Sequence, residues 1–298
     1  MCTTCGCSDG AVATVSGPGI VSAELHSHGN GHGHDHPEGQ AHVHPHGHPH
    51  EHGHDHGETA RDRAREVEAR GFRPQRSSRT LRLEEDLLAK NGELAERNRG
   101  WLEGRKVVAL NLTSSPGSGK TTLLERTIRE LGASLPISVI EGDQETLRDA
   151  ERIRAAGGRA VQINTGSGCH LDAEMIREGL RRLDPPPRSL VMIENVGNLV
   201  CPALFDLGER AKVVIVSVTE GEDKPLKYPH MFRAASLMIV NKVDLLPHLT
   251  FDVDRLLENA RRVNPGLSAL QVSSTRGDGL EEWYGWLSQQ APAAAAWS

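Results

Sequence analysis

From Lys106 onward the chain alternates short apolar runs with longer stretches in which charged and apolar residues are mixed. The apolar runs have the length of strands and are VVALNL (107–112), ISVIEG (137–142), AVQIN (160–164), SLVMIE (189–194), KVVIVSV (212–218), SLMIVN (236–241) and SALQVSS (268–274). Helix-like stretches lie between them, such as TLLERTIRELG, LDAEMIREGLRRL and FDVDRLLENARRV. Strands that are apolar along their whole length are buried on both faces, as happens when helices cover a parallel sheet. We therefore predict an α/β fold with a mostly parallel sheet flanked by helices, and ligands at the carboxyl ends of its strands.

The N-terminal part of the chain has a different composition. Residues 1–60 consist largely of Gly, His, Pro and Asp, so they cannot bury enough apolar surface to offset the entropy lost on ordering. Residues 80–103 carry leucines and a tryptophan among charges, which indicates an amphipathic helix, broken near Asn91-Gly92. We expect a disordered Cys/His-rich metal-binding region and linker at 1–78, a helix at 79–104 that docks on the next domain, that domain at 105–290, and a tail at 291–298.

Composition argues against several classes of protein. The net charge of -6, with histidines neutral, disfavours a nucleic-acid partner. No apolar run approaches the length that spans a membrane, and the first residues, MCTTCGCSDG, lack the features of a secretory signal. Five cysteines, an odd number of which three lie close together at one end, indicate reduced thiols in a cytoplasmic protein.

A glycine-rich turn joins the first predicted strand to a predicted helix. Its sequence, SSPGSGKTT (114–122), matches the phosphate-loop pattern G-x-x-x-x-G-K-[ST] except that Ser114 replaces the first glycine. Backbone amides of such a loop and the N-terminus of the following helix attract phosphate oxygens. We expect Lys120 to reach the outer phosphates and Thr121 to hold magnesium; the alternative is a chance glycine-rich turn. The predicted phosphate-binding residues are Gly117, Ser118, Gly119, Lys120, Thr121 and Thr122.

NKVD (241–244) follows the sixth predicted strand and indicates which base is bound. Guanine presents two adjacent donors on its Watson–Crick edge, and the Asp244 carboxylate can accept both, whereas adenine presents an acceptor there. Asn241 can bond the N7/O6 side of guanine, and the Lys242 stem can lie along the ring. After the last strand we expect backbone donors to guanine O6 from Ser273, Ser274 and Thr275.

Two further strands end in carboxylates. In EGD (141–143) we choose Asp143 as the switch carboxylate near magnesium, with Glu141 as the alternative. ENVGN (194–198) resembles the D-x-x-G switch of GTPases with Glu194 in place of Asp, and Gly197 is placed to donate an amide to the γ-phosphate. Asn198 stands where many GTPases carry a water-orienting Gln, and because Asn is shorter we expect slow hydrolysis. Each carboxylate could instead cap a helix N-terminus. The predicted catalytic residues are Lys120, Asp143, Glu194 and Gly197.

The N-terminal cysteines form the first candidate metal site. Cys2, Cys5 and Cys7 lie close enough in sequence to chelate one cation, with the terminal amine as a fourth donor. A square-planar S/N environment suits Ni(II) and tetrahedral sulfur suits zinc, so the spacing leaves the metal open. The alternative is an unstructured, oxidation-prone tail.

A second candidate metal site combines Cys169 and His170, after the third strand, with Cys201, after the fourth. Because Cys201 follows Glu194 closely, metal bound here would touch the loops that sense the γ-phosphate. Metal and nucleotide would then each change the other's affinity. Three such ligands rarely complete a tetrahedron, which a site shared between two protomers would do. The alternative is one buried Cys and a helix-capping His.

A histidine tract is the third metal-binding feature. Thirteen of the 16 histidines lie between His26 and His56. Such a tract binds Ni, Zn, Cu or Co with little discrimination and has no fixed geometry, so it indicates storage rather than catalysis. The irregular spacing, without six consecutive histidines, argues against a purification tag.

Together these motifs resemble those of the hydrogenase nickel-incorporation GTPases, the HypB family of metal-insertion P-loop GTPases. The motifs are CTTCGC, the histidine tract, SSPGSGKTT, GCHLD, ENVGNLVCP and NKVD, and they cover nearly the whole chain. The resemblance implies a cytoplasmic GTPase that binds GTP or GDP, Mg²⁺, Ni²⁺ and Zn²⁺ and dimerises with GTP. Its implied partners are a HypA-like zinc-containing nickel chaperone and the large-subunit precursor of a [NiFe]-hydrogenase. It also implies a terminal nickel site at Cys2, Cys5 and Cys7 and a G-domain metal site at Cys169, His170 and Cys201.

Three other functions remain as alternatives. A urease-accessory GTPase is also His-rich and nickel-linked, but we would expect a Cys-Pro-His type ligand motif there, and this chain has the adjacent pair Cys169-His170. A nickel or zinc storage protein with a regulatory G domain is compatible with nickel delivery. A signalling GTPase would leave the Cys and His ligands unexplained.

Overall fold

The computed structural model describes residues 14–16, 23–24, 78–143 and 148–291. The chain divides into two compact units, one of Met1–Ser27 with Leu83–Ser298 and one of His28–Arg82. Of the second unit, only residues 78–82 are described. The predictions for Cys2, Cys5, Cys7 and the histidine tract therefore lie outside the described residues. None of the described helices combines the length and the apolarity needed to cross a membrane.

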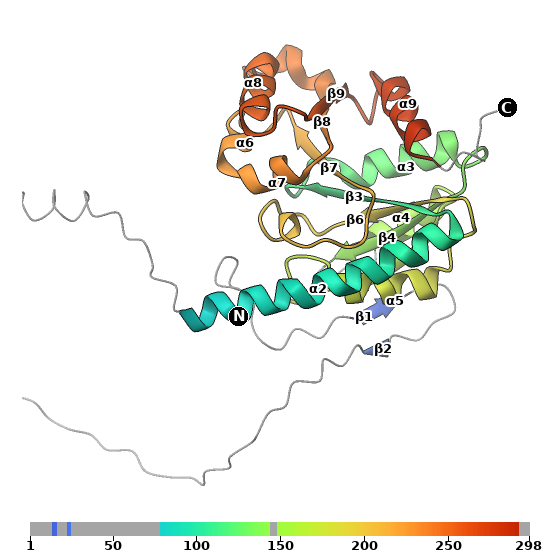
Figure 1. The fold of residues 1–298 in the computed structure, drawn as a ribbon. Coiled ribbons are helices and arrows are strands. Elements are labelled where there is room, and N and C mark those ends of the chain that lie inside the picture. Colours follow the sequence, from blue (N-terminus) through green and yellow to red (C-terminus); the bar gives the residue numbers. More distant parts are fainter. Residues whose placement is uncertain (1–13, 17–22, 25–77, 144–147, 292–298) are drawn as a thin grey trace, which may run out of the picture. The chain divides into compact units, whose positions relative to one another are not determined.

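Seven parallel strands form the centre of the first unit, which confirms the predicted fold class (Figure 1). Their order in the sheet is β5-β4-β6-β3-β7-β8-β9. The chain goes from β3 to β4 on one side of β3 and later crosses from β6 to β7 on the other side, so the strand order reverses beside β3. Open α/β sheets bind ligands at such a point. The strands are β3 (Val108–Ser114), β4 (Ile137–Asp143), β5 (Arg159–Asn164), β6 (Leu190–Glu194), β7 (Ala211–Ser217), β8 (Leu237–Asn241) and β9 (Ser268–Val272).

Two short strands extend this sheet from the region that we expected to lack regular structure. β1 (Thr14–Ser16) pairs antiparallel with β5, and β2 (Ala23–Glu24) pairs antiparallel with β1. These five residues therefore form strands inside the region for which we predicted disorder. The physical reason is the free edge of β5, whose backbone donors and acceptors can pair with any extended segment.

Helices cover both faces of the sheet, because alternate residues of each strand point to opposite sides. Apolar residues on one face pack with α3 (Lys120–Leu131), α4 (Arg148–Ala155) and α9 (Leu280–Gln290). Those on the other face pack with α2 (Ser78–Arg105), α5 (Ala173–Leu183), α7 (Pro229–Ala234) and α8 (Val253–Val263). Shorter elements are η1 (Cys201–Ala203), α6 (Lys224–Lys227) and η2 (Val243–His248).

Helix α2 runs without interruption through Asn91-Gly92, so the predicted break is absent. Asn91 is buried, its amide donates to the carbonyl of Asp206, and its side-chain oxygen accepts the backbone N–H of Ala173. Further along the helix, the Asn98 amide donates to the carbonyls of Ala173 and Leu207. These bonds hold the helix against the loops that follow β5 and β6, which local propensity does not reveal.

Candidate functional site

A cavity of about 550 Å³ opens at the carboxyl ends of the central strands. The phosphate loop (residues 114–122), the end of β4, the start of α4 and the switch loop (residues 194–198) contribute to its wall. The lining residues that the sequence predicted are Gly117, Ser118, Gly119, Lys120, Thr121, Thr122, Glu141, Asp143, Glu194, Gly197 and Lys242.

The phosphate loop has the backbone that its glycines allow. Gly117 and Gly119 have φ angles of 74° and 95°, in the left-handed region that favours glycine. A Cβ on Gly119 would lie 2.5 Å from Asn241 Nδ2, so a side chain is also excluded by contact. Ser114, at the end of β3, accepts a hydrogen bond from Lys120 Nζ at 2.8 Å. The residue that departs from the general pattern thus positions the lysine of the loop.

Thr121 and Glu194 connect the phosphate loop to the switch loop. The Thr121 hydroxyl donates to Glu194 Oε1 over 2.7 Å, and both side chains are buried. A Cβ on Gly197 would lie 3.0–3.2 Å from atoms of Pro116, so the two loops also touch through their backbones. The structure therefore brings the predicted catalytic residues Lys120, Glu194 and Gly197 to one wall of the cavity.

Three carboxylates lie together beside these loops. Glu141 and Glu194 are neighbours in the pairing of β4 with β6, and Asp143 lies two residues beyond Glu141 on the same strand. Burial raises the pKa of Glu141 to about 9, and the charges of Glu194 and Asp143 act in the same direction. Burial also raises the pKa of Glu194, against the opposing influence of Lys120. Carboxylates this close repel one another when charged, and a bound cation would stabilise their charged forms.

The guanine motif lies next to the phosphate loop. Asn241 donates to the carbonyl of Ser118 and accepts hydrogen bonds from the Ser274 hydroxyl and amide, so its amide joins the two loops. Lys242 Nζ donates to the carbonyl of Gly117 at 2.7 Å. The Asp244 carboxylate accepts a hydrogen bond from the Ser273 hydroxyl, which orients it. Thr275 is exposed, at the outer side of this group.

The second predicted metal site forms a compact group of side chains. The ligand atoms of Cys169, His170 and Cys201 all lie within 4.8 Å of one another, and we refer to these residues as the metal-ligand cluster. Cys201 is buried, and the other two are partly exposed. Burial lowers the pKa of His170, which favours the neutral imidazole that binds metals. The ring of Phe205 lies on His170 with the ring centroids 4.0 Å apart.

Comparisons with known proteins agree with this geometry. Residues 108–271 match the family model described as CobW/HypB/UreG, nucleotide-binding domain. The hydrogenase maturation factor HypB of Escherichia coli K12 is 59% identical over 212 residues, 71% of this chain and 73% of that protein. The chain belongs to the HypB family. HypB of Azotobacter vinelandii is 60% identical over 213 residues, 72% of this chain and 70% of that protein.

Two crystal structures of HypB-family proteins resemble this one. HypB from Archaeoglobus fulgidus has a TM-score of 0.63 and 44% identity, and the match covers 67% of this chain and 98% of that one. HypB from Helicobacter pylori in complex with nickel has a TM-score of 0.63 and 38% identity, over 67% and 94% of the two chains. These matches agree with the P-loop GTPase fold of the chain.

Some residues of this HypB-family site were not predicted. Arg152 and Asp149, on α4, line the cavity, and Arg152 pairs with Glu125 of α3 as well as with Asp149. Nothing in the local sequence distinguishes them from the other charges of a surface helix. Phe205 was also missed, although an aromatic residue shortly after NLVCP was visible in the sequence.

The side chain of Asn198 also differs from its expected direction in a GTPase. Its amide donates to the carbonyl of Cys169 at 3.3 Å, and its oxygen accepts the backbone N–H of Val200. Asn198 is not among the residues that line the nucleotide cavity. In this HypB-family protein it therefore faces the metal-ligand cluster rather than the place of an attacking water.

Proposed function

We propose that this protein is a GTP-hydrolysing nickel metallochaperone that stores nickel and delivers it during maturation of [NiFe]-hydrogenase. The observation that carries the proposal is the position of the metal-ligand cluster. Cys169 and His170 stand in the loop between β5 and α5, and Cys201 begins η1 directly after the switch loop. The same switch loop lines the cavity of the phosphate loop, so a change at the γ-phosphate reaches the metal ligands over a short path.

The cluster of three carboxylates, Glu141, Asp143 and Glu194, fits the Mg²⁺ that accompanies GTP. Glu141 Oε2 and Glu194 Oε2 are buried and have no hydrogen-bond partner among the residues that the structure describes. Magnesium prefers oxygen donors and is held with few protein ligands beside the phosphates. We assign Thr121 and Asp143 as its principal contacts, with Glu194 and Glu141 close by. The ion, when bound, neutralises charge on the phosphates; Lys120 and the amide of Gly197 bind the phosphate oxygens.

Nickel is the cargo of this proposal. Two thiolates and one imidazole, the donors of the metal-ligand cluster, suit nickel as well as zinc. The crystal structure of the Helicobacter pylori relative was determined in complex with nickel, which supports nickel as the transported ion. Cys2, Cys5 and Cys7 would hold nickel at a second site and the histidine tract would store it, as the sequence predicts.

The remaining parts of the proposal concern assembly. We propose that GTP promotes a homodimer, in which a second copy completes the three-ligand cluster. A HypA-like zinc-containing chaperone and the large-subunit precursor of the hydrogenase would be the partners in the cytoplasm. We propose slow hydrolysis, because the Asn198 amide donates to the carbonyl of Cys169 and does not orient the attacking water.

Hydrogenase activity in cells that lack the native protein tests the proposal. The wild-type chain should restore activity at limiting nickel, whereas Lys120→Ala and His170→Ala should restore little. His248→Ala, the same substitution at an exposed histidine outside the cluster, serves as the matched control. Full restoration by Lys120→Ala would contradict a nucleotide-dependent role. Deletion of residues 26–57 should lower cellular nickel retention and spare activity when nickel is plentiful; lost activity under those conditions would contradict the storage role.

A further inference from the structure

Asn195 bonds directly to the loop that carries two of the three metal ligands. It lies in the switch loop, is 1% exposed, and its neighbours Glu194 and Val196 line the nucleotide cavity. Its side-chain oxygen accepts the backbone N–H of Leu171, the residue after His170, at 3.2 Å. The same oxygen accepts the N–H of Val196 at 3.0 Å. One buried carbonyl oxygen thus holds a switch-loop amide and an amide of the loop between β5 and α5.

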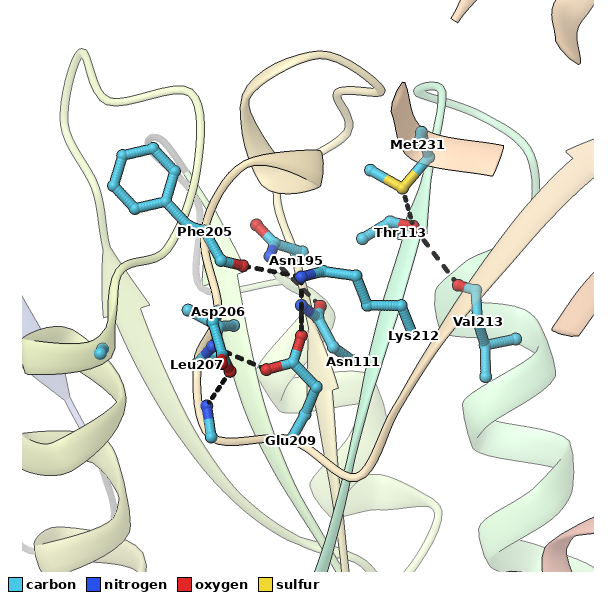
Figure 2. A network of polar contacts seen from close by, with 12 residues as sticks. Asn111, Thr113, Asn195, Phe205, Asp206, Leu207, Glu209, Lys212, Val213 and Met231 are labelled. Atoms are coloured by element: carbon cyan, nitrogen blue, oxygen red, sulfur yellow. Dashed lines mark hydrogen bonds and ion pairs between the residues drawn. The ribbon is translucent and has the colours of Figure 1, made fainter. Parts of the chain in front are cut away.

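The other end of the Asn195 amide enters a buried polar network that begins at Asn111 of β3 (Figure 2). Its nitrogen donates to Asn111 Oδ1 at 3.2 Å, and Asn111 in turn donates to Glu209 Oε1 at 3.1 Å. Glu209 Oε2 accepts the backbone N–H of Leu207 at 2.6 Å. This branch therefore runs from the switch loop through β3 to the segment that follows η1.

Lys212 completes the network and connects it to Phe205. Its ammonium group lies 3.0 Å from Glu209 Oε1 and donates to the carbonyl of Phe205 at 2.8 Å, as Figure 2 shows. Because the Phe205 ring lies on His170, the second branch returns to the metal-ligand cluster. Both ends of the Asn195 amide thus lead to the surroundings of His170.

Asn198 supplies a parallel bond at the other end of the switch loop. Its amide donates to the carbonyl of Cys169 at 3.3 Å, while its oxygen accepts the N–H of Val200, one residue before Cys201. The switch loop is therefore tied to the backbone of both ligand-bearing segments, at Leu171 by Asn195 and at Cys169 and Val200 by Asn198.

We propose that Asn195 is the positioning residue that transmits the nucleotide state to the metal-ligand cluster, with Asn198 as a secondary connection. This inference rests on the proposed function and names the residues that carry its coupling. A buried donor or acceptor that loses its partner destabilises the structure. When the switch loop moves with the γ-phosphate, the bonded N–H of Leu171 and the Asn111 network therefore move with it. The spacing of Cys169, His170 and Cys201 changes as a consequence.

Nucleotide affinities measured on the full chain test this inference. The dissociation constants of fluorescent GDP and of a fluorescent non-hydrolysable GTP analogue are compared with Ni²⁺ and with a chelator. The coupling factor is the change that Ni²⁺ causes in the ratio of these two constants. For the wild type we expect a factor within the range of about 5–150 that allosteric pairs usually show. Cys201→Ala should bring the factor close to one, because nickel then binds only outside the cluster.

Asn195→Ala should reduce the coupling factor to within about twofold of one, and Asn198→Ala should reduce it less. Asn259→Ala is the matched control, since Asn259 is also buried and donates to a loop carbonyl, that of Glu222, but joins neither site. The control should keep the wild-type factor. If Asn195→Ala does not fold, Asn198→Ala alone decides, and a wild-type factor for that variant overturns the inference.

The outcomes separate this inference from the proposed function. Coupling in the wild type that persists in Asn195→Ala overturns the role of Asn195 and leaves the proposed function standing. A wild-type factor of one overturns the coupling itself, and the assignment of Asn195 with it. A loss of coupling in Asn195→Ala and also in Asn259→Ala would show a general loss of stability and overturn the specific role.

Discussion

The Thr121 hydroxyl donates a hydrogen bond to Glu194 Oε1 over 2.7 Å, although the two residues lie on different loops and 73 positions apart. The bond joins the first turn of α3 to the end of β6, at the point where the strand order reverses. A cation and a nucleotide that enter the cavity must therefore meet both loops at once. This relationship makes the phosphate loop and the switch loop one unit.

Thr121→Val should weaken the binding of the Mg²⁺ complex of GTP by roughly 10–100-fold, because it removes a ligand and leaves a buried Glu194 oxygen without its donor. Thr121→Ser keeps the hydroxyl and should bind close to wild type. Titration calorimetry with and without Mg²⁺ measures the difference. Equal Mg²⁺ dependence in the valine variant would place the ion elsewhere.

Asp244→Asn should exchange base specificity from guanine to xanthine. The variant presents an amide donor where xanthine has a carbonyl, and it loses a charge-assisted pair of hydrogen bonds, so GTP affinity should fall roughly 100-fold. Competition between GTP and xanthosine triphosphate gives the measurement. Asp254→Asn, at an exposed aspartate of α8, is the control. Unchanged GTP affinity would contradict the guanine assignment.

Glu141→Gln should change the pH dependence of stability in the metal-free, nucleotide-free protein. The folded pKa of Glu141, about 9, lies above its ordinary value of 4.5, so the folded state binds the proton more tightly than the unfolded state. The unfolding free energy should then decrease as the pH rises from about 5 to 9. Glutamine removes this dependence, and the variant should gain roughly 2 kcal/mol relative to wild type at pH 8 but not at pH 5. Urea unfolding at both pH values measures it; parallel curves would contradict the buried, uncompensated state of Glu141.

Asn98→Ala should destabilise the protein by about 1–3 kcal/mol, since two buried carbonyls, of Ala173 and Leu207, lose their donor. Glu93→Ala, at an exposed position of the same helix, should change stability by less than about 0.5 kcal/mol. The comparison, by urea unfolding, tests whether α2 belongs to the folded unit of the G domain. Equal stabilities would show that the helix docks weakly.

The fold could be predicted because the signals that define it are local. Each of the seven predicted strands overlaps an observed one, since fully apolar runs between helices have few other arrangements. Because the strands are parallel, the polar residues that follow them meet at the carboxyl-end edge of the sheet. Cys169, His170 and Cys201 lie close together for the same reason.

Two properties could not be predicted from the sequence: how deeply a side chain is buried, and which distant residues it hydrogen-bonds. Glu141 and Asp143 share one face of β4 by spacing alone, yet only Glu141 is enclosed between Glu194 and the sheet. The sequence predicted a helix break near Asn91-Gly92. The hydrogen bonds that hold Asn91 within an unbroken helix could not be predicted, because its partners Asp206 and Ala173 are far away in sequence. In the same way Asn195 and Asn198 carry no pattern that shows which loop their amides reach.

The central claim is that one metal site senses the nucleotide. A nickel titration of the full chain, with GDP and with a non-hydrolysable GTP analogue, tests it most directly when stoichiometry and oligomeric state are followed together. Cys201→Ala, titrated in parallel, identifies the contribution of the metal-ligand cluster. The account predicts one class of sites whose nickel affinity differs between the two nucleotides by about 5-fold or more, and which Cys201→Ala abolishes. The same nickel affinity with both nucleotides in the wild-type chain would contradict it.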